Sequence, residues 1–324
     1  MTTYKGIKGF NIQTVSSDPP APFAGEVWYN STSATVKYFA VQASSWSTGD
    51  NLPVGVDLNM GCGLQTAALA FGGEDPGGTV PKAKEYDGSS WTNGGNLTSG
   101  RGGGAGAGTQ TAALAFGGSP SPVSAATEEY NGSSWTNGGN LGTGRYNILG
   151  GAGTQTAGLA FGGGNPNATN ITEEYNGSSW TAGGAMAAPR SNFSGFGLQT
   201  AALAAGGAVS SPPFSGSATS EEYNGSSWTS GGTMNSGRIQ LSGAGTQTAG
   251  LVFGGDPDVT STEQYNGTSW TTSSNMNTGR KTLAGAGTQT AGLAFGGESS
   301  GAASSNATEE FDGGGPATFT VGTD

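Results

Sequence analysis

The stretch TEEYNGSSWTNGGNL, residues Thr127–Leu141, decides the fold because the chain repeats it. It returns as TEEYNGSSWTAGGAM at Thr172–Met186 and again further along. Its centre, Asn131-Gly132, tolerates the positive φ angles of a two-residue type I′ turn. The same turn signal recurs at Asp87-Gly88, Asn176-Gly177, Asn224-Gly225, Asn266-Gly267 and Asp312-Gly313. We therefore expect each copy to form a β-hairpin, with EEY in one strand and SSWT in the other.

A second repeated element precedes each hairpin: a short apolar run, such as TAALAF, that ends in Gly-Gly. The first glycines are Gly72, Gly117, Gly162, Gly206, Gly254 and Gly296, spaced 42 to 48 residues apart. That period fits a four-stranded propeller blade, and the run is too short for a helix. The Gly- and Ala-rich piece before it, AGAGTQ in one copy, predicts an innermost strand, where side chains near the axis must be small. A flexible linker is the alternative, but a linker would not repeat its register.

The composition alone gives a different impression. With 63 glycines in 324 residues, the chain has the profile of a low-complexity segment. Fixed intervals between Trp, Tyr and Gly-Gly argue against disorder, because repeat units bury their apolar faces against copies of themselves. The sequence therefore predicts an all-β repeat domain.

Charge and residue usage exclude several functions. The net charge of −11 offers no cationic surface for nucleic acid. We expect no membrane insertion and no cleaved signal, since no apolar run is long enough and MTTYKGIKGFNIQTV lacks a cleavage pattern. The single cysteine, Cys62, allows no internal disulfide, and the absence of histidine argues against zinc, haem and Ser-His-Asp chemistry. We expect no cofactor and no metal.

Large aromatic rings recur once per copy. The tryptophans are Trp91, Trp135, Trp180, Trp228 and Trp270, each five residues after a tyrosine. Rings of this size would fill the wedge between neighbouring blades. Stacking on a sugar is the alternative, but a binding residue would not be needed in every copy. We predict a structural role.

All five arginines occupy one repeated position before the glycine-rich strand. They are Arg101, Arg145, Arg190, Arg238 and Arg280. In an up-and-down blade this position shares an end with the start of the EEY strand, where Glu128, Glu173, Glu221, Glu263 and Glu309 lie. We predict a ring of bidentate Arg–carboxylate pairs that locks the blades. An anion-binding ring is the weaker alternative, because carboxylates already neutralise the arginines.

These ordered elements resemble the Kelch repeat: Gly117-Gly118, then Glu128, Tyr130-Asn131, Trp135 and Arg145 in one copy. The resemblance covers about residues 55–312 and implies a β-propeller of four-stranded antiparallel blades. GEVWYN, TVKYFA and SSWSTGDNL, with Trp46, could supply strands of a further blade, closed by ATFTVG near the C-terminus. We therefore expect seven blades, or six with the early strands as an appendage, in a propeller over residues 24–324 after an N-terminal docking arm, residues 1–23.

One set of loops varies in length and sequence, while the repeated strands around these loops stay constant. These loops join the Gly-Gly run to the EEY strand, and binding residues are usually carried on such loops. Neutral drift in solvent-exposed loops is the alternative. The candidate ligand-binding residues on them are Asp75, Pro120, Asn165, Asn167, Phe214, Asp256 and Asp258.

Residues 16–39, SSDPPAPFAGEVWYNSTSATVKYF, resemble a phrase of bacteriophage tail-fibre and other virion proteins. The glycine-rich copies with GTQTA and EYNGSSWT also resemble proteins of marine phages. The resemblance implies a protein of the virion surface, assembled in the host cytoplasm in multiple copies and able to form a homo-oligomer. Its implied partners are other virion proteins, bound through the N-terminal arm, and a glycan or protein of the host surface.

Two other functions remain open. A glycosidase-like propeller enzyme needs paired carboxylates that break the repeat pattern, and Asp256 and Asp258 are the nearest candidates. Carboxylates that recur in register in almost every copy favour a structural role, so we expect no enzyme activity. A purely structural decoration of the virion is the second alternative.

Overall fold

The computed structural model describes residues 12–119, 123–147, 151–164, 167–209, 215–300 and 303–321. All regular secondary structure in these residues is β-strand, as predicted. The chain forms two compact units. The larger is Ser45–Asp312, and the smaller combines Met1–Ser44 with Gly313–Asp324. The predicted boundary after residue 23 therefore falls inside the smaller unit.

Within the described residues, the larger unit contains six four-stranded antiparallel sheets, which we call blades 1 to 6. Blade 1 is β5 (Met60–Leu64), β6 (Ala67–Phe71), β9 (Ala83–Tyr86) and β10 (Trp91–Asn93), with an added hairpin of β7 (Glu74–Asp75) and β8 (Gly78–Thr79). Blade 2 is β11 (Ala105–Thr109), β12 (Ala112–Phe116), β13 (Thr127–Tyr130) and β14 (Trp135–Asn137). Blade 3 is β15 (Ala152–Thr154), β16 (Ala157–Phe161), β17 (Thr172–Tyr175) and β18 (Trp180–Ala182).

The other three blades repeat this order. Blade 4 is β19 (Ser194–Leu198), β20 (Ala201–Ala205), β21 (Ser220–Tyr223) and β22 (Trp228–Ser230). Blade 5 is β23 (Ser242–Thr246), β24 (Ala249–Phe253), β25 (Thr262–Tyr265) and β26 (Trp270–Thr272). Blade 6 is β27 (Ala284–Gly287), β28 (Ala291–Phe295), β29 (Thr308–Asp312) and β4 (Ser45–Thr48). We call the strands of a blade A to D from the inside outward.

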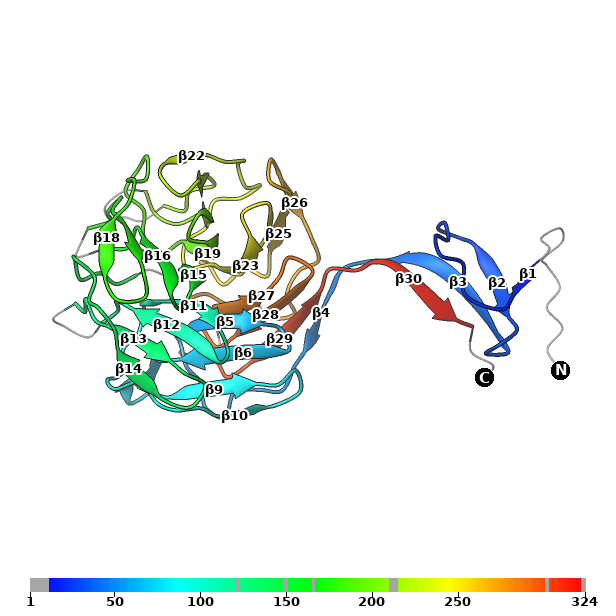
Figure 1. The fold of residues 1–324 in the computed structure, drawn as a ribbon, viewed down its shortest axis with the longest axis horizontal. Coiled ribbons are helices and arrows are strands. Elements are labelled where there is room, and N and C mark those ends of the chain that lie inside the picture. The colour runs from blue at the N-terminus through cyan, green and yellow to red at the C-terminus, as the bar shows by residue number, and fades with distance from the viewer. Residues whose placement is uncertain are drawn as a thin grey trace. The chain divides into compact units, whose positions relative to one another are not determined.

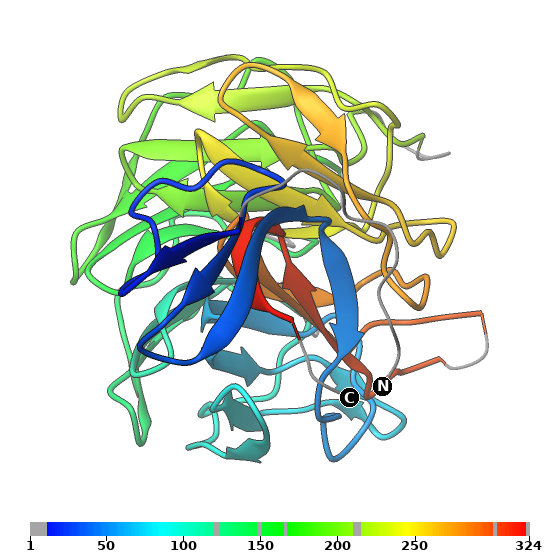
Figure 2. The ribbon, with the colours of Figure 1, turned by 90° about the vertical axis from the view of Figure 1, so that its right-hand side faces the viewer.

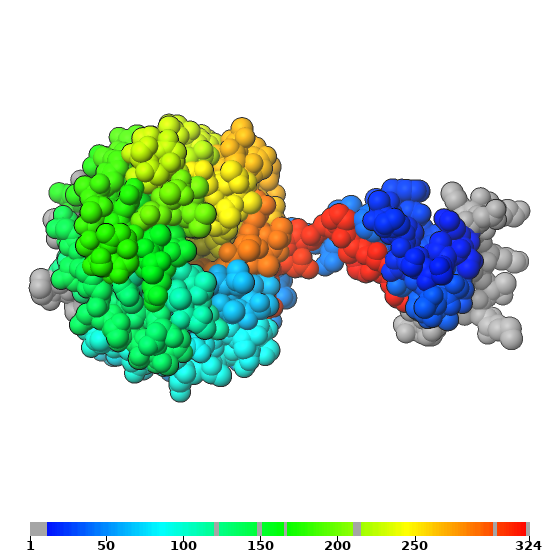
Figure 3. All heavy atoms as spheres, in the orientation of Figure 1, coloured from blue at the N-terminus to red at the C-terminus, as the bar shows by residue number. Residues whose placement is uncertain are grey.

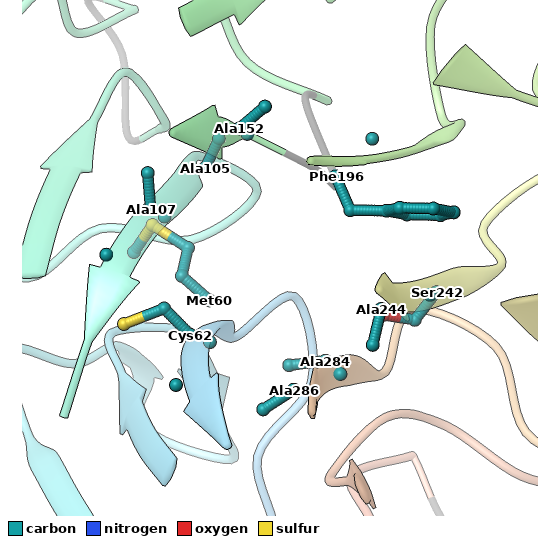
Figure 4. Close-up of a pocket in the computed structure, with 18 of the residues that line it drawn as sticks. Met60, Cys62, Ala105, Ala107, Ala152, Phe196, Ser242, Ala244, Ala284 and Ala286 are labelled. Atoms are coloured by element: carbon teal, nitrogen blue, oxygen red, sulfur yellow. The ribbon is translucent and has the colours of Figure 1, made fainter. Parts of the chain in front are cut away.

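The six blades form a closed ring (Figure 1). Their A strands contact one another in the order β5, β11, β15, β19, β23, β27 and back to β5. In the space-filling view, blade 1 in light blue lies against blade 6 in orange (Figure 3). The A strands line a central channel, and most of the side chains that face it are small, such as Ala105 and Ala284 (Figure 4). The glycine- and alanine-rich runs are therefore the innermost strands, as predicted.

The seven-blade expectation differs from this ring in its treatment of the early strands. The last sequence copy lacks a Trp-bearing strand, and β4 supplies it: Trp46 pairs in register with Phe311 of β29. Joining the N-terminal side to the last blade removes two exposed sheet edges. The other early strands, with the C-terminal strand, form a sheet in the smaller unit instead of a seventh blade.

The Gly-Gly pairs are fixed by the next blade. Gly72 and Gly73 have φ of +63° and +100°, and a Cβ on Gly72 would lie 2.5 Å from the Arg101 carbonyl oxygen. The Gly73 N–H donates to that carbonyl at 2.8 Å. Equivalent bonds are Gly118 to Arg145, Gly163 to Arg190, Gly207 to Arg238, Gly255 to Arg280 and Gly297 to Val56. The last of these closes the ring from blade 6 to blade 1.

The smaller unit is built on one four-stranded sheet (Figure 2). Its order is β1 (Gln13–Val15), β2 (Val27–Asn30), β3 (Thr35–Gln42) and β30 (Gly315–Thr320). Strand β1 runs parallel to β2, and the other neighbours are antiparallel. Both ends of the described chain therefore belong to this sheet.

Candidate functional site

The variable loops share one end of the propeller with the linkers between blades. In every blade, the first residue after Gly-Gly forms a β-bridge with the linker that leads into strand A. The bridges are Asp57–Glu74, Gly102–Ser119, Tyr146–Gly164, Ser191–Ala208, Ile239–Asp256 and Lys281–Glu298. We call this end the loop face. It is the candidate functional site, and its frame is the same in all blades except blade 1.

Buried arginines hold the frame of the loop face. In blade 3, Arg145 Nη2 donates to Glu173 Oε1 at 2.9 Å, while Nη1 donates to the Gly162 and Ile171 carbonyls at 3.0 and 2.9 Å. The second carboxylate oxygen of Glu173 accepts the Gly142 N–H at 2.6 Å. The pair is therefore not bidentate, contrary to our prediction. The guanidinium divides its donors between the carboxylate and two carbonyls.

The same ion pair occurs in five blades. The pairs are Arg101–Glu128, Arg145–Glu173, Arg190–Glu221, Arg238–Glu263 and Arg280–Glu309. All ten side chains are at least nine-tenths buried. Each arginine lies in the linker from one blade and its glutamate on strand C of the next, so each pair ties two successive blades together. Breaking a buried pair by removing one partner typically costs 3–5 kcal/mol, roughly, because the remaining charge stays buried.

The second glutamate of the repeated phrase binds the following blade. Tyr175 Oη donates to Glu129 Oε1 at 2.6 Å, and burial together with this bond raises the pKa of Tyr175 to about 12. The other pairs are Tyr86–Glu310, Tyr130–Glu85, Tyr223–Glu174 and Tyr265–Glu222. Blade 5 has Gln264 in place of the second glutamate, and the next blade has Phe311, which carries no hydroxyl, in place of the tyrosine. Both carboxylates of the phrase thus have structural partners, as the sequence indicated.

The opposite end of the propeller carries a glutamine ring that sequence reasoning missed. Gln247 Nε2 donates to the Ala202 and Tyr223 carbonyls of the preceding blade at 3.0 and 2.7 Å. The same two bonds are made by Gln65, Gln110, Gln155, Gln199 and Gln289. The signal was present, because glutamine recurs at this turn in all six copies.

The tryptophans lie between blades, where the wedge-filling prediction places them. Trp180 packs on Phe116 of the preceding blade with ring centroids 5.0 Å apart, and its Nε1 donates to Thr127 Oγ1 at 2.9 Å. Trp46, Trp91 and Trp228 also donate to a threonine, and Trp270 donates to Ser220. Trp135 differs, because its buried Nε1 has no partner. Ala83 occupies the position in the preceding blade at which a threonine would accept this hydrogen bond.

The candidate loop residues differ in their surroundings. Asp75 lies on β7, where its carboxylate accepts from Lys82 Nζ at 3.1 Å and from the Gly77 N–H, which lower its pKa. Asp256 pairs with Lys281 at 3.1 Å, Asp258 has a positive φ of 42°, and Asn167 is exposed. Pro120, Asn165 and Phe214 lie outside the described residues. Among the described candidates, Asp75 belongs to blade 1, Asn167 to blade 3, and Asp256 and Asp258 to the same loop of blade 5.

Blade 1 departs from the frame at the arginine site. Val56 stands in the arginine position, since its carbonyl accepts from Gly297 as that of Arg101 does from Gly73. Lys84 takes the place of the glutamate, because it pairs with Ala70 in the register that Glu128 has with Ala115. Pro53 takes the place of the residue whose backbone N–H donates to that glutamate in the other blades. A pocket lies here, lined among others by Leu52, Val54, Val56, Phe71, Val80, Lys82 and Lys84. The space that the guanidinium fills elsewhere is thus part of an apolar pocket with lysines at its wall.

Comparison with known proteins supports the fold alone. No protein-family model and no curated protein sequence matches the chain. Among solved structures, that of YjhT is similar with a TM-score of 0.65 at 13% identity, covering 80% of this chain and 95% of that one. Together with the ring of four-stranded sheets, this similarity shows a β-propeller architecture.

Two kinds of feature are absent from the described residues. No helix among them is long and apolar enough to cross a membrane. They also hold no group of three or more His, Cys, Asp or Glu side chains placed to bind a metal ion.

Proposed function

We propose that the chain is a non-enzymatic surface protein of a bacteriophage virion, whose Kelch-like propeller attaches to the host surface through its loop face. One observation carries the proposal: the frame of the loop face is nearly identical from blade to blade, while the loops on it differ. Loops held by a rigid scaffold are where recognition residues are usually found.

The loops differ in both length and chemistry. The blade 4 loop, residues 208–220, reads AVSSPPFSGSATS, whereas the blade 5 loop, residues 256–262, reads DPDVTST. Both begin at the same β-bridge to the linker. Blade 1 adds the β7–β8 hairpin and the apolar pocket. A surface that varies on a constant base favours binding of a specific ligand, for which a glycan or protein of the host surface is the proposed class.

The carboxylates of the frame favour binding over catalysis. A glycosidase needs two carboxyl groups free to act as acid and as base or nucleophile. In blades 2 to 6 the first glutamate of the phrase pairs with a buried arginine. In every blade except blade 5, the second glutamate accepts a hydrogen bond from a tyrosine hydroxyl. Asp256, the nearest catalytic candidate, is ion-paired with Lys281.

The smaller unit is the proposed attachment to the virion. Residues 16–39, which carry the resemblance to virion proteins, fold around Asp18. Its carboxylate accepts from Trp28 Nε1, Asn30 Nδ2 and Lys37 Nζ at 3.1, 2.8 and 2.7 Å. These bonds lower the pKa of Asp18 to about 2. The motif therefore specifies a folded element, and a folded element supports a role in assembly better than a flexible linker would.

Mass spectrometry of purified virions from the source culture tests the location. We expect peptides of this chain in particles banded on a density gradient, at a constant ratio to capsid protein across the band. Absence from the particle would refute the virion proposal.

A loop exchange tests attachment. We would replace residues 208–220 with the blade 5 loop and measure how well the purified chain blocks phage adsorption to host cells. We expect the exchanged chain to block less while its melting temperature is unchanged. A matched exchange at the opposite end, Thr288→Ser in the A–B turn of blade 6, should block normally. Equal blocking by both variants would instead favour a purely structural decoration.

A further inference from the structure

The blade 1 pocket lies where the other blades hold a guanidinium group. In blades 2 to 6 the arginine donates to two backbone carbonyls, one of which belongs to the first glycine of Gly-Gly. The equivalent carbonyls in blade 1 are those of Gly72 and Lys82, and the Gly72 N–H donates to the Lys82 carbonyl at 2.9 Å as in the other blades. Val56, at the arginine position, has no polar side-chain atom. Blade 1 therefore keeps the acceptors of the arginine site without their donor.

The pocket admits a small group from the surface. Val54 and Lys82 line it, Val54 is 47% exposed and the Lys82 side chain is 49% exposed, so the pocket reaches solvent at the loop face. Its volume is about 30 Å³, whereas one water needs roughly 10–15 Å³. The pocket therefore has room for a group of a few non-hydrogen atoms, comparable with the guanidinium that occupies this place in the other blades.

The wall of the pocket combines apolar side chains with a hydrogen-bond donor. Val56, Phe71 and Val80 supply apolar surface. Lys84 also lines the pocket and stands where the other blades have a glutamate. Its Nζ donates to Asn93 Oδ1, and an ammonium group has further donors for a ligand.

Asn59 adds a buried amide to the wall of the pocket. The equivalent residues in blades 4 to 6 are apolar: Phe193, Leu241 and Leu283. Asn59 is 4% exposed and lines the pocket, and neither its Oδ1 nor its Nδ2 has a hydrogen-bond partner among the described residues. An unpaired buried amide is destabilising. An amide that replaces an apolar residue beside a pocket therefore indicates a polar occupant.

We propose that the blade 1 pocket binds the acetamido group of an N-acetylated amino sugar. This group is planar and has the same number of non-hydrogen atoms as a guanidinium. Its N–H supplies a donor for the Gly72 and Lys82 carbonyls, and its carbonyl oxygen accepts from the Lys84 ammonium. Its methyl group packs on the apolar wall.

The same groups disfavour other small occupants. A cation would meet Lys82 and Lys84 without the glutamate that balances it in the other blades, and Asp75 already pairs with Lys82. A carboxylate has no N–H for the two backbone carbonyls. A purely apolar group would leave these carbonyls and the Asn59 amide unpaired. A neutral amide that carries a methyl group avoids all of these costs.

The groups around the mouth favour a sugar as the carrier of the acetamido group. Lys82 and Asp75 form an ion pair there, with Nζ and Oδ2 3.1 Å apart, and both residues line the pocket. Hydroxyl groups beside the acetamido group of a sugar ring can hydrogen-bond to both. In an acetylated lysine, the acetamido group follows a methylene chain that forms no hydrogen bonds. The choice of a host-surface glycan rests on the function proposed above.

Saturation-transfer difference NMR on the full chain tests the pocket. The probes are methyl N-acetyl-β-glucosaminide and methyl β-glucoside, which differ only in the acetamido group, and the corresponding galacto pair. Because the pocket holds one small group, we expect a Kd on the order of 1 mM for an acetylated sugar. Saturation should be strongest at the acetyl methyl protons, and the sugars without the acetamido group should bind at least tenfold more weakly.

Filling the pocket should abolish this preference. Pro53→Thr, Val56→Arg and Lys84→Glu together copy the blade 2 network into blade 1, so the new arginine occupies the pocket. This triple variant should bind acetylated sugars at least tenfold more weakly, and its melting temperature reports whether it folds. Val56→Leu is the second variant, because it reduces the volume of the pocket by a smaller change, and it should also weaken binding.

Thr92→Arg combined with Thr136→Glu is the control for the added side chains. It introduces an arginine and a glutamate at exposed positions on the outermost strands of blades 1 and 2, and neither position lines the pocket. This variant should bind acetylated sugars like the unmodified chain.

Several results would overturn the proposal. They are no binding of the acetylated sugars, equal binding of sugars with and without the acetamido group, and unchanged binding in the folded triple variant or in Val56→Leu. Tighter binding of an acetyl-lysine peptide than of any sugar would assign the pocket to a protein ligand and would also overturn it. None of these results changes whether the chain is found in virions, which mass spectrometry of the particles tests separately.

Discussion

Blade 1 and the five other blades share one backbone arrangement but differ in what holds it. In blades 2 to 6 a buried arginine, a glutamate and a backbone N–H form one network. In blade 1 the corresponding residues are Val56, Lys84 and Pro53. All three members are replaced together, so no buried charge and no orphaned N–H remains from this network. The network is therefore exchanged as a unit, because any partial loss would leave an unsatisfied group.

Removing the network in part should have the largest effect. Arg190→Val leaves Glu221 buried without its ion pair and should lower the unfolding free energy by about 3–5 kcal/mol. Arg190→Val with Glu221→Lys and Ala187→Pro copies the blade 1 solution into blade 4. Because it removes the buried carboxylate and the N–H that bound it, this triple variant should lose less than the single one. Urea denaturation measures both.

A triple variant as unstable as Arg190→Val would contradict exchange as a unit. It would mean that the blade 1 solution depends on other residues of that blade. An unchanged melting temperature in Arg190→Val would refute the structural role of the arginine ring altogether.

Blade 1 also holds an acidic residue at a position that is neutral or basic in the other blades. Burial, with Glu298 and Glu74 nearby, raises the pKa of Asp57 to about 6. Because this pKa is higher in the folded than in the unfolded chain, Asp57 favours folding while it is protonated, and this contribution is lost as the pH rises through about 6. Asp57→Asn should therefore stabilise the chain at pH 7.5, by at most about 3 kcal/mol, and have little effect near pH 4.

Thermal unfolding from pH 4 to pH 8 measures this difference. The exposed Asp50→Asn is the control for a lost surface charge and should follow the unmodified chain. A difference between Asp57→Asn and the unmodified chain that does not change with pH would contradict a role for Asp57 titration.

The sequence predicted the repeating parts of the fold well. Periodic Gly-Gly, Asn-Gly and Trp signals indicated four-stranded blades, and the Arg and Glu positions indicated ion pairs that the structure contains. It did not predict which terminal strands join the ring. Both β2 and β4 carry a buried tryptophan, Trp28 and Trp46, so their local patterns look alike. Strand β4 pairs directly with β29, whereas β2 pairs with β3, which in turn pairs with β30. Both long-range pairings join residues more than 260 positions apart in the sequence.

The details of the loop face could not be predicted from the sequence pattern either. The single-oxygen contact of each arginine depends on where two carbonyls point, and this follows from the tertiary fold. The blade 1 pocket was signalled only by Lys84, since Val56 and Pro53 become informative once they are aligned with Arg101 and Thr98. The loop candidates came from variation alone, which indicates where a ligand could bind but not how.

The smallest predicted effect concerns one hydrogen bond that blade 1 omits. Trp135 Nε1 is buried without a partner, and in other blades a threonine at the position of Ala83 accepts this bond, as Thr127 does from Trp180 at 2.9 Å. Ala83→Thr should therefore raise the unfolding free energy by about 1 kcal/mol. Ala83→Val is the matched control, because it adds the same volume and β-branching without the hydroxyl. Chemical denaturation of both variants separates the causes: equal stabilisation by valine would attribute the gain to packing and show that the unpartnered indole N–H costs nothing measurable.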